Sequence, residues 1–209
     1  MLDMRIVCLS DTHDLHGQLE VPDGDLLLHA GDATMSGTPQ QIEEFDAWLA
    51  RQPHRHKVVI AGNHDWGFQR TPARARSLLR HATYLEDSLA EVAGLRIWGA
   101  PWQPWFYDWA FNLARGPQIA AKWALIPDGI DVLITHGPPL GILDRTSRGD
   151  AVGCADLLAA LVRVRPRLHV FGHIHEAYGR LDRDGCIFVN ASNCSERYRP
   201  VQPPIVVDL

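Results

Sequence analysis

The sequence predicts an α/β protein whose β-sheet structure is buried by helices. Short, continuous apolar runs alternate with segments whose apolar residues recur at helical spacing. Continuous apolar runs are typical of strands that are covered on both faces. With 209 residues, 46% hydrophobic and 22% charged, the chain has an ordinary globular composition. We therefore expect a single domain over residues 1–209.

The first predicted helix has the clearest boundaries in the sequence. Thr38 can cap its start, Pro39 suits its first position, and Gln41 completes a capping box. Pro53 ends the segment. Residues at helical spacing form its apolar face: Ile42, Phe45 and Leu49.

The remaining predicted elements follow from the same patterns. Apolar runs predict strands at residues 6–9, 26–28, 58–60, 132–134, 170–171, 187–189 and 205–207. Residues 89–92 and 95–98 flank Gly94 and predict a hairpin. Helices are expected at residues 72–81, 118–125 and 155–164, the last ending before Pro166.

The charge and cysteine content exclude several classes of protein. A net charge of -5 disfavours a general nucleic-acid binder and gives no grip on anionic membranes. No apolar run approaches the roughly 20 residues of a membrane helix, and residues 1–7 lack the features of a signal peptide. The four cysteines form no Cys-x-x-Cys pair, so we expect free thiols in a reducing, cytoplasmic protein. Cys194 is of interest because it lies near the site proposed below.

Side chains able to bind metal follow five of the predicted strands directly. In open α/β sheets, ligands gather at the carboxyl ends of strands, so these side chains should converge. Adjoining glycines allow the sharp turns that such convergence needs. The candidates, in strand order, are Asp11 with His13, Asp32, Asn63, His136, and His173 with His175.

The chemistry of this set predicts two metal ions. Carboxylates, imidazoles and one amide, without thiolate, suit Mn, Fe or Zn and disfavour a structural zinc site. Seven ligands exceed the need of one ion with an open position, but suit two ions about 3.5–4 Å apart. The positive charge of two divalent ions exceeds the negative charge of Asp11 and Asp32. The net positive charge that remains can activate water and attract a phosphate anion.

The order of these motifs resembles a known family. Asp-x-His, Gly-Asp, Gly62-Asn63-His64-Asp65, a lone His and Gly-His-x-His, spanning Asp11 to His175, are similar to the calcineurin-like metallophosphoesterases. The closer resemblance is to the small class III cyclic-nucleotide-type phosphodiesterases and the vertebrate brain metallophosphoesterase-domain proteins. It rests on residues 8–13, 99–106, 135–139 and 190–192.

The resemblance implies a fold and a role for each residue. It implies a four-layer sandwich of two mixed sheets flanked by helices. Asp32 would bridge two metals, and His64, steadied by Asp65, would protonate the leaving group without binding metal. The first metal would be held by Asp11, His13 and His175, and the second by Asn63, His136 and His173.

The expected activity is hydrolysis of phosphodiesters, including cyclic nucleotides, by a metal-bridging hydroxide, with Asn63 helping to stabilise the developing charge. A phosphomonoesterase or nuclease using the same metals is the enzymatic alternative, and a nucleotide-binding scaffold is the non-enzymatic one. The expected partner is a small phosphate ester, with a nucleotide as one candidate, and a homodimer is an open alternative.

The sequence also contains aromatic, histidine and arginine residues outside the proposed ligand set. The aromatic segment, residues 98–111, suits either a core or subunit interface, or a wall that stacks on a nucleobase. His29 and His169 lie in strand runs and are expected in the core. Solvent-exposed positions are expected for His16, His54, His56, Arg145 and Arg148.

Overall fold

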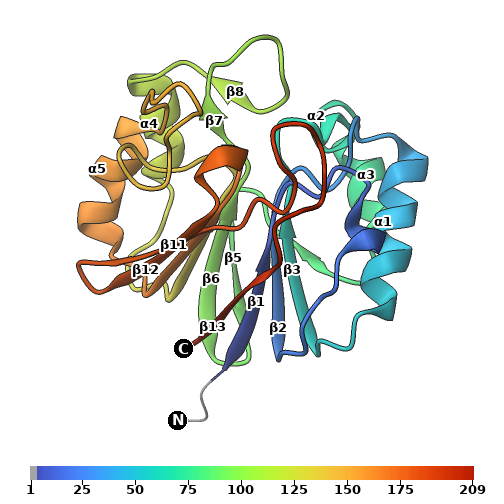
Figure 1. Ribbon diagram of the computed structural model, residues 1–209. Coiled ribbons are helices and arrows are strands. Elements are labelled where there is room, and N and C mark those ends of the chain that lie inside the picture. The colour runs from blue at the N-terminus through green and yellow to red at the C-terminus, as the bar shows by residue number, and fades with distance from the viewer. Residues whose placement is uncertain (1–3) are drawn as a thin grey trace.

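The structure is a computed structural model that describes residues 4–209. It contains two large sheets that lie face to face (Figure 1). The first comprises, in spatial order, β13 (Ile205–Asp208), β1 (Arg5–Leu9), β2 (Leu26–Ala30), β3 (His56–Ile60) and β4 (Thr83–Tyr84). The second comprises β11 (Gly179–Arg183), β12 (Cys186–Asn190), β10 (Leu168–Phe171), β9 (Val132–Thr135), β6 (Leu95–Ala100) and β5 (Ser88–Val92).

Both sheets are mixed, as the resemblance implied. Strands β1 to β4 pair in parallel, and β13 closes that sheet in the antiparallel direction. In the second sheet β6, β9, β10 and β12 are parallel, while β5 and β11 form antiparallel edges. The carboxyl ends of the parallel strands therefore lie at one end of the molecule, opposite the C-terminus (Figure 1).

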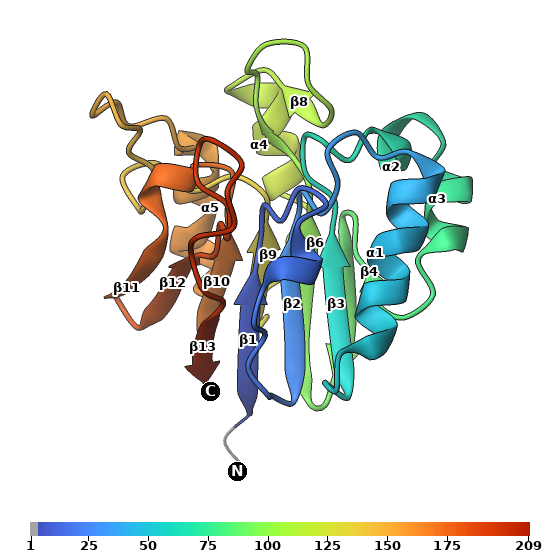
Figure 2. The same ribbon diagram turned by 45° about the vertical axis from the view of Figure 1, so that its right-hand side comes forward.

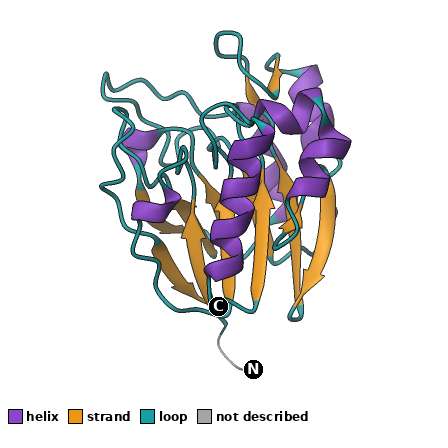
Figure 3. Ribbon diagram, turned by 90° about the vertical axis from the view of Figure 1, so that its right-hand side faces the viewer, coloured by secondary structure: helices purple, strands orange, loops and turns teal. Residues whose placement is uncertain are grey.

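Successive side chains along each strand point to opposite faces of the sheet, and each face packs against a different layer. Ile6 and Cys8 of β1 face the second sheet, whereas Val7 and Leu9 face the helices on the other side. The first sheet is covered by α1 (Pro39–Arg51), α2 (Trp66–Arg70) and α3 (Pro72–Leu78), and the second by α4 (Pro117–Trp123) and α5 (Ala155–Val164). The four-layer α/β/β/α arrangement is thus confirmed, and Figure 3 views it from the side of α1.

The boundaries of α1 follow the sequence signals. Thr38 Oγ1 accepts from the backbone N–H of Gln41, and the Gln41 side chain accepts from the Thr38 N–H in return. Ile42, Phe45 and Leu49 are buried as predicted. Such a cap contributes about 1 kcal/mol.

Several elements differ from the prediction for identifiable reasons. Helix α3 stops at Leu78 rather than residue 81, because the N–H groups of Arg80 and His81 donate to Asp46 at 2.6 and 2.8 Å instead of extending the helix. Edge strand β11 is mostly polar and exposed, so no apolar run marks it. The sequence also did not reveal the short elements α2, β4, β7 (Gln103–Pro104) and β8 (Asn112–Leu113).

The remaining histidines and cysteines test the burial predictions. His29 and His169 are fully buried, as expected. The prediction that His16 and His54 are exposed is wrong: they are 7% and 2% exposed, and His16 packs against Phe45 and Trp48. All four cysteines are free and buried.

Across residues 4–209, the structure has no helix with the length and apolar character needed to cross a membrane. The expectation that the chain begins without a signal peptide falls in part on residues 1–3, which lie outside the described residues.

Candidate metal centre

The loops that follow β1, β2, β3, β9 and β10 meet at one end of the two sheets (Figures 1 and 2). The first loop is tied to the second by backbone hydrogen bonds from Asp11 to Gly31 and from His13 to Asp32. The backbone N–H of His173, from the second sheet, donates to the Asp11 carboxylate at 2.9 Å. The predicted ligands of the two sheets are therefore brought together.

Four of these residues adopt a backbone conformation that side chains usually avoid. The φ angles of Asp11, His13, Asp32 and His173 are 52°, 44°, 53° and 70°, in the left-handed region. Each such conformation costs on the order of 1–2 kcal/mol, and such strain concentrates at functional sites. These turns lie just after β1, β2 and β10, where the donor side chains gather.

Two glycines of the motifs are required by close approach. A Cβ atom on Gly172 would collide with the Asp11 carboxylate and the Ser10 side chain. One on Gly62 would collide with the Asp32 carboxylate and backbone. Their role is thus to leave room for the two carboxylates.

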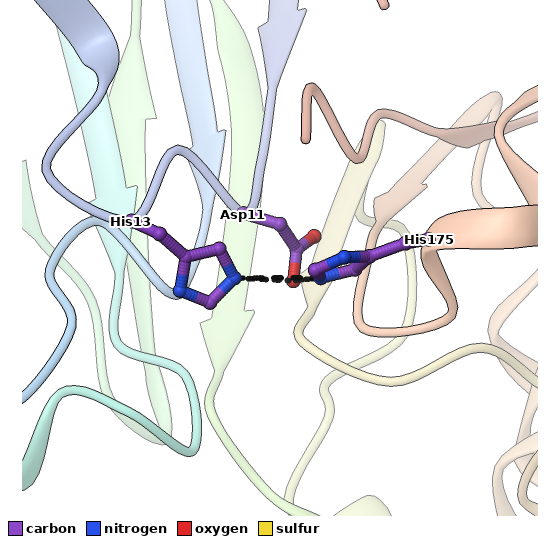
Figure 4. Close-up of side chains that lie close together, drawn as sticks. All are labelled: Asp11, His13 and His175. Atoms are coloured by element: carbon purple, nitrogen blue, oxygen red, sulfur yellow. Dashed lines mark hydrogen bonds and ion pairs between the residues drawn. The ribbon is translucent and has the colours of Figure 1, made fainter. Parts of the chain in front are cut away.

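One cluster of donor atoms surrounds Asp11 (Figure 4). His175 Nε2 lies 3.2 Å from Asp11 Oδ1 and 3.4 Å from His13 Nε2. Both imidazoles point their Nε2 atoms toward the carboxylate from opposite sides. These are the three residues expected to hold the first metal.

A second cluster surrounds Asp32. Its Oδ2 lies 3.4 Å from His136 Nε2 and 3.9 Å from His13 Nε2, between the two groups of ligands. His136 Nε2 also lies 2.8 Å from Asn63 Oδ1. This intermediate position suits the bridging role expected for Asp32.

The donor set fits metal ions. Ligands about 2.0–2.2 Å from one ion lie roughly 3–3.5 Å from each other, which is the spacing of several pairs here. His136 Nδ1 donates to the Ala30 carbonyl at 2.9 Å, and His175 Nδ1 donates to the Ser195 carbonyl at 3.0 Å. These bonds place the proton on Nδ1 and leave Nε2 to coordinate, as in known metal sites.

The electrostatics of the cluster favour cations. Burial opposes the charge on Asp11, but His175, His136 and His13 hold its pKa well below the usual value. Burial likewise opposes the imidazolium of His136, but the Asp32 carboxylate raises its pKa to about 9. Burial lowers the pKa of His13 to about 4, which keeps that imidazole neutral. The two charged carboxylates and the neutral imidazole of His13 are in the forms that metals need, whereas His136 and His175, whose pKa the nearby carboxylates raise to about 9, would release a proton when a cation binds.

Of the predicted ligands, His173 lies least close to the other donor atoms. Its ring centroid lies 4.9 Å from that of His136, but its nitrogens do not fall within the tight clusters found among residues 4–209. Burial lowers the pKa of His173 to about 3, so the ring is neutral. Its position beside His136 agrees with the expected second metal without defining a bond to it.

His64 lies beside the clusters, and its surroundings correct one expectation. Its Nδ1 donates to the Met35 carbonyl at 3.0 Å, and its ring lies against Trp109 with centroids 4.3 Å apart and planes tilted by 30°. The expectation that Asp65 steadies this ring is wrong as a direct contact. A nitrogen of His64 is also close enough to His13 and Asp32 to complete a metal cluster, so ligation by His64 is the competing role.

The Asp65 carboxylate instead joins two loops. It accepts from the N–H and hydroxyl of Thr34 at 3.0 and 2.7 Å, and from the N–H groups of Gly62 and Ala33 at 2.9 and 3.3 Å. Burial and the nearby Asp32 raise its pKa to about 6. Asp65 can therefore affect His64 only through the backbone.

Sequence analysis assigned no place beside the metal ligands to three residues that lie there, although Trp109 belongs to the aromatic segment that it considered as a substrate wall. Trp109 lies against His64 with the ring planes tilted by 30°, Tyr198 lies edge-on to His13 with ring centroids 4.8 Å apart, and Ser192 Oγ donates to Asp11 at 2.8 Å. Tyr198 has a φ of 52°, and such a backbone cannot be inferred from sequence. The Asn190-Ala191-Ser192 stretch, noted only as a resemblance, was the available signal for Ser192.

The aromatic segment divides into two parts. Trp98 and Phe111 belong to the core, whereas Trp105, Phe106 and Tyr107 are 65%, 53% and 74% exposed. Trp105 and Phe106 line a cavity of about 300 Å³ that reaches His173. A larger hollow of about 540 Å³, between α5 and β12, contains none of the predicted site residues. Arg145 and Arg148 are exposed, as expected.

A four-layer fold that gathers Asp, Asn and His donors at the carboxyl ends of its strands defines the class of metallophosphoesterases. The chain belongs to the calcineurin-like phosphoesterase family, whose profile matches residues 4–177. The human metallophosphoesterase domain-containing protein 1 is 47% identical over 230 residues, which cover 98% of this chain and 71% of the human protein.

More distant comparisons agree with this assignment. A Synechococcus protein described as a probable cyclic nucleotide phosphodiesterase is 28% identical, with 78% of this chain and 62% of that protein covered. The solved structure of a Thermus thermophilus protein shares the fold with a TM-score of 0.62, 12% identity and 99% coverage of each chain.

Proposed function

We propose that this phosphoesterase is a phosphodiesterase that depends on two metal ions and accepts cyclic nucleotides. The observation that carries the proposal is the position of Asp32 Oδ2 between His13 and His136, which would let one carboxylate serve two ions. The Synechococcus relative supports the substrate class by its description. Mn, Fe and Zn are the metals that suit the donors.

The proposed ligands are those named from the sequence. Asp11, His13 and His175 would hold one ion, Asn63, His136 and His173 the other, and Asp32 both. Such ions, when bound, would activate water and neutralise charge on the phosphate.

The chain's own contribution centres on His64. Because Met35 holds the proton of Nδ1, Nε2 is the nitrogen that can carry a second proton to the leaving oxygen. Trp109 covers one side of the ring, with the two planes tilted by 30°. Asn63 would orient its amide oxygen toward the second ion while its backbone carbonyl anchors Ala110 of the aromatic segment.

A metal titration coupled to a substrate screen tests the proposal. Purified active protein should carry close to two metal equivalents, chelation should abolish activity, and Mn²⁺ should restore it. At equal metal loading, bis(4-nitrophenyl) phosphate should be hydrolysed faster than 4-nitrophenyl phosphate. A preference for the monoester would make the protein a phosphomonoesterase with the same metals, and full activity without metal would refute the metal-dependent mechanism.

A further inference from the structure

The two carboxylate oxygens of Asp11 lie in different surroundings. Oδ1 lies 3.2 Å from His175 Nε2 and 4.0 Å from His13 Nε2, so it faces both imidazoles (Figure 4). Oδ2 is the nearer acceptor for the backbone N–H of His173, at 2.9 Å against 3.2 Å for Oδ1. Oδ2 also accepts from the Ser192 hydroxyl at 2.8 Å. Oδ1 is therefore the oxygen available to a metal ion, whereas Oδ2 is held by hydrogen bonds.

Ser192 reaches Asp11 from the second sheet. It lies just beyond the end of β12 and forms a parallel bridge with Ser10, which follows β1 directly. The backbone N–H of Asn193 donates to the Ser10 carbonyl at 2.8 Å and ties the two segments together. Ser192 is fully buried, and its Oγ also lies 2.9 Å from Asn190 Oδ1. Its hydroxyl thus has two neighbouring acceptors.

The orientation of the Asn190 side chain follows from its own donors. Its Nδ2 donates to the carbonyls of Ile174 and Leu143 at 2.9 and 3.2 Å, so its Oδ1 faces Ser192. That oxygen accepts from the backbone N–H of Ser192 at 3.2 Å. A flipped amide would place its oxygen against two carbonyl oxygens, which offer no proton. Asn190 therefore joins Ser192 to Ile174, the residue between the two histidine ligands of the second sheet.

The single proton of the Ser192 hydroxyl can go to only one of its two acceptors. The Asp11 carboxylate is charged, and a hydrogen bond to a charged acceptor is roughly twice as strong as one to a neutral amide oxygen. The Asn190 oxygen is already satisfied by the N–H of Ser192. The hydroxyl proton is therefore directed to Asp11 Oδ2.

From this geometry we propose that Ser192, held in place by Asn190, is a positioning residue for the metal centre. It fixes the Asp11 carboxylate so that Oδ1 stays turned toward His13 and His175, the residues proposed to share an ion with it. Loss of a hydrogen-bond partner of a metal ligand typically costs about 10–100-fold in metal affinity. The inference rests on the ligands of the proposed function, but metal binding can be measured without any substrate.

Titration of the chelated protein with Mn²⁺ tests this role. In Ser192→Ala, the affinity for one of the two Mn²⁺ equivalents should fall by about 10–100-fold, with the other little changed. Ser192→Cys keeps a weak donor and should lose less. In Ser192→Ala, the kcat for bis(4-nitrophenyl) phosphate should return close to its original value at saturating Mn²⁺, because excess metal overcomes weak binding. Unchanged affinity, or lost turnover that no Mn²⁺ concentration restores, would overturn the inference.

Two further variants provide the control and locate the affected ion. Ser10 is equally buried in the same bridge, but its hydroxyl donates to the Gly31 carbonyl at 3.3 Å, so Ser10→Ala should retain both affinities. His175→Ala should remove the ion beside Asp11. In that background, Ser192→Ala should leave the remaining affinity unchanged, and a further loss would place the effect at the other ion and refute the inference.

Asn190→Ala tests the link to Ser192. It should lower the same Mn²⁺ affinity, and its effect should not add to that of Ser192→Ala, because both act through one hydrogen bond. Additive losses would show that Asn190 does not act through Ser192. Mn²⁺ binding that depends on Ser192, in a protein that hydrolyses no diester, would support the inference and overturn the proposed function. Mn²⁺-dependent diester hydrolysis with unchanged affinity in Ser192→Ala would do the reverse.

Discussion

At the scale of single residues, backbone contacts decide what the candidate catalytic groups can do. His64 is held by the Met35 carbonyl and the Trp109 ring, whereas Asp65 holds loops. The sequence motif named both residues but could not show this division. A hydrogen bond to a carbonyl 29 residues away depends on how two loops meet, which no local pattern records.

His64→Ala tests the proposed proton donor. A ribose oxygen is a basic leaving group that needs a proton, whereas nitrophenolate hardly needs one. The variant should therefore slow hydrolysis of a cyclic nucleotide by about 10²–10⁴-fold. The loss on bis(4-nitrophenyl) phosphate should be much smaller, and both metals should be retained.

Metal content and both rates should be measured on one preparation. Loss of metal in His64→Ala would identify His64 as a ligand, the role that its closeness to His13 and Asp32 also allows. Equal losses on both substrates with metals intact would show that His64 orients the phosphate rather than donating a proton.

Asp65→Asn tests the loop-joining role. An amide has one acceptor oxygen where the carboxylate has two, so it cannot satisfy all four donors and places N–H groups against others. We expect the free energy of unfolding to fall by about 2–4 kcal/mol. Rates on both substrates should decline together, as measured by denaturant titration and steady-state assays. A selective loss on cyclic nucleotides with unchanged stability would restore a direct role toward His64.

At the scale of elements, the turns that follow the strands restrict the choice of residues more than the strands themselves do. Apolar runs predicted the central strands, because burial on both faces leaves a continuous signal. They did not predict β11, whose polar residues are exposed at a sheet edge, or α2, which is only five residues long. His54 was misplaced because loop polarity outweighed packing in the prediction.

Gly172→Ala tests the requirement for space in one such turn. The added methyl group would collide with the Asp11 carboxylate and the Ser10 side chain, so one of them must move. We expect metal affinity to fall at least tenfold, measured by metal titration of the chelated protein. Gly17→Ala is the control, because nothing lies within 4 Å of the added atom and the φ angle of Gly17 is ordinary. Unchanged affinity in Gly172→Ala would show that the turn accommodates the methyl group.

At the scale of the whole molecule, each of the two sheets buries a histidine whose Nε2 lies beside a threonine hydroxyl. In the first, His29 Nε2 lies 3.0 Å from the Thr12 hydroxyl, and in the second, His169 Nε2 lies 2.9 Å from that of Thr135. Both sheets thus bury a neutral histidine beneath the site. Burial lowers the pKa of each to about 3, against an ordinary 6.5.

These histidines predict a loss of stability in acid. The unfolded chain binds protons at both positions below about pH 6.5, whereas the folded protein does not until about pH 3. Their contribution is therefore complete above pH 6.5 and declines as the pH falls through that window, by up to about 1.4 kcal/mol per pH unit for each histidine. His169→Gln keeps a donor for Thr135 and should show a shallower decline in the free energy of unfolding. Parallel curves for the two proteins would show that His169 does not titrate on unfolding.

The candidate metal centre is built across the seam between the sheets rather than within either one. Asp11 extends from β1 yet is held by His173 and Ser192 of the other half, and His136 reaches back to Ala30. Ions held there would bind residues of both sheets and so stabilise the folded state. A ligand at a hundred times its dissociation constant adds about 2.7 kcal/mol to the free energy of unfolding. Metal supply would thus affect the stability of the protein as well as its activity, because chains without ions would unfold and be degraded more readily than chains that hold them. A cell short of metal would thus hold an inactive and less stable protein, and added metal would reactivate only the chains that had not yet been degraded.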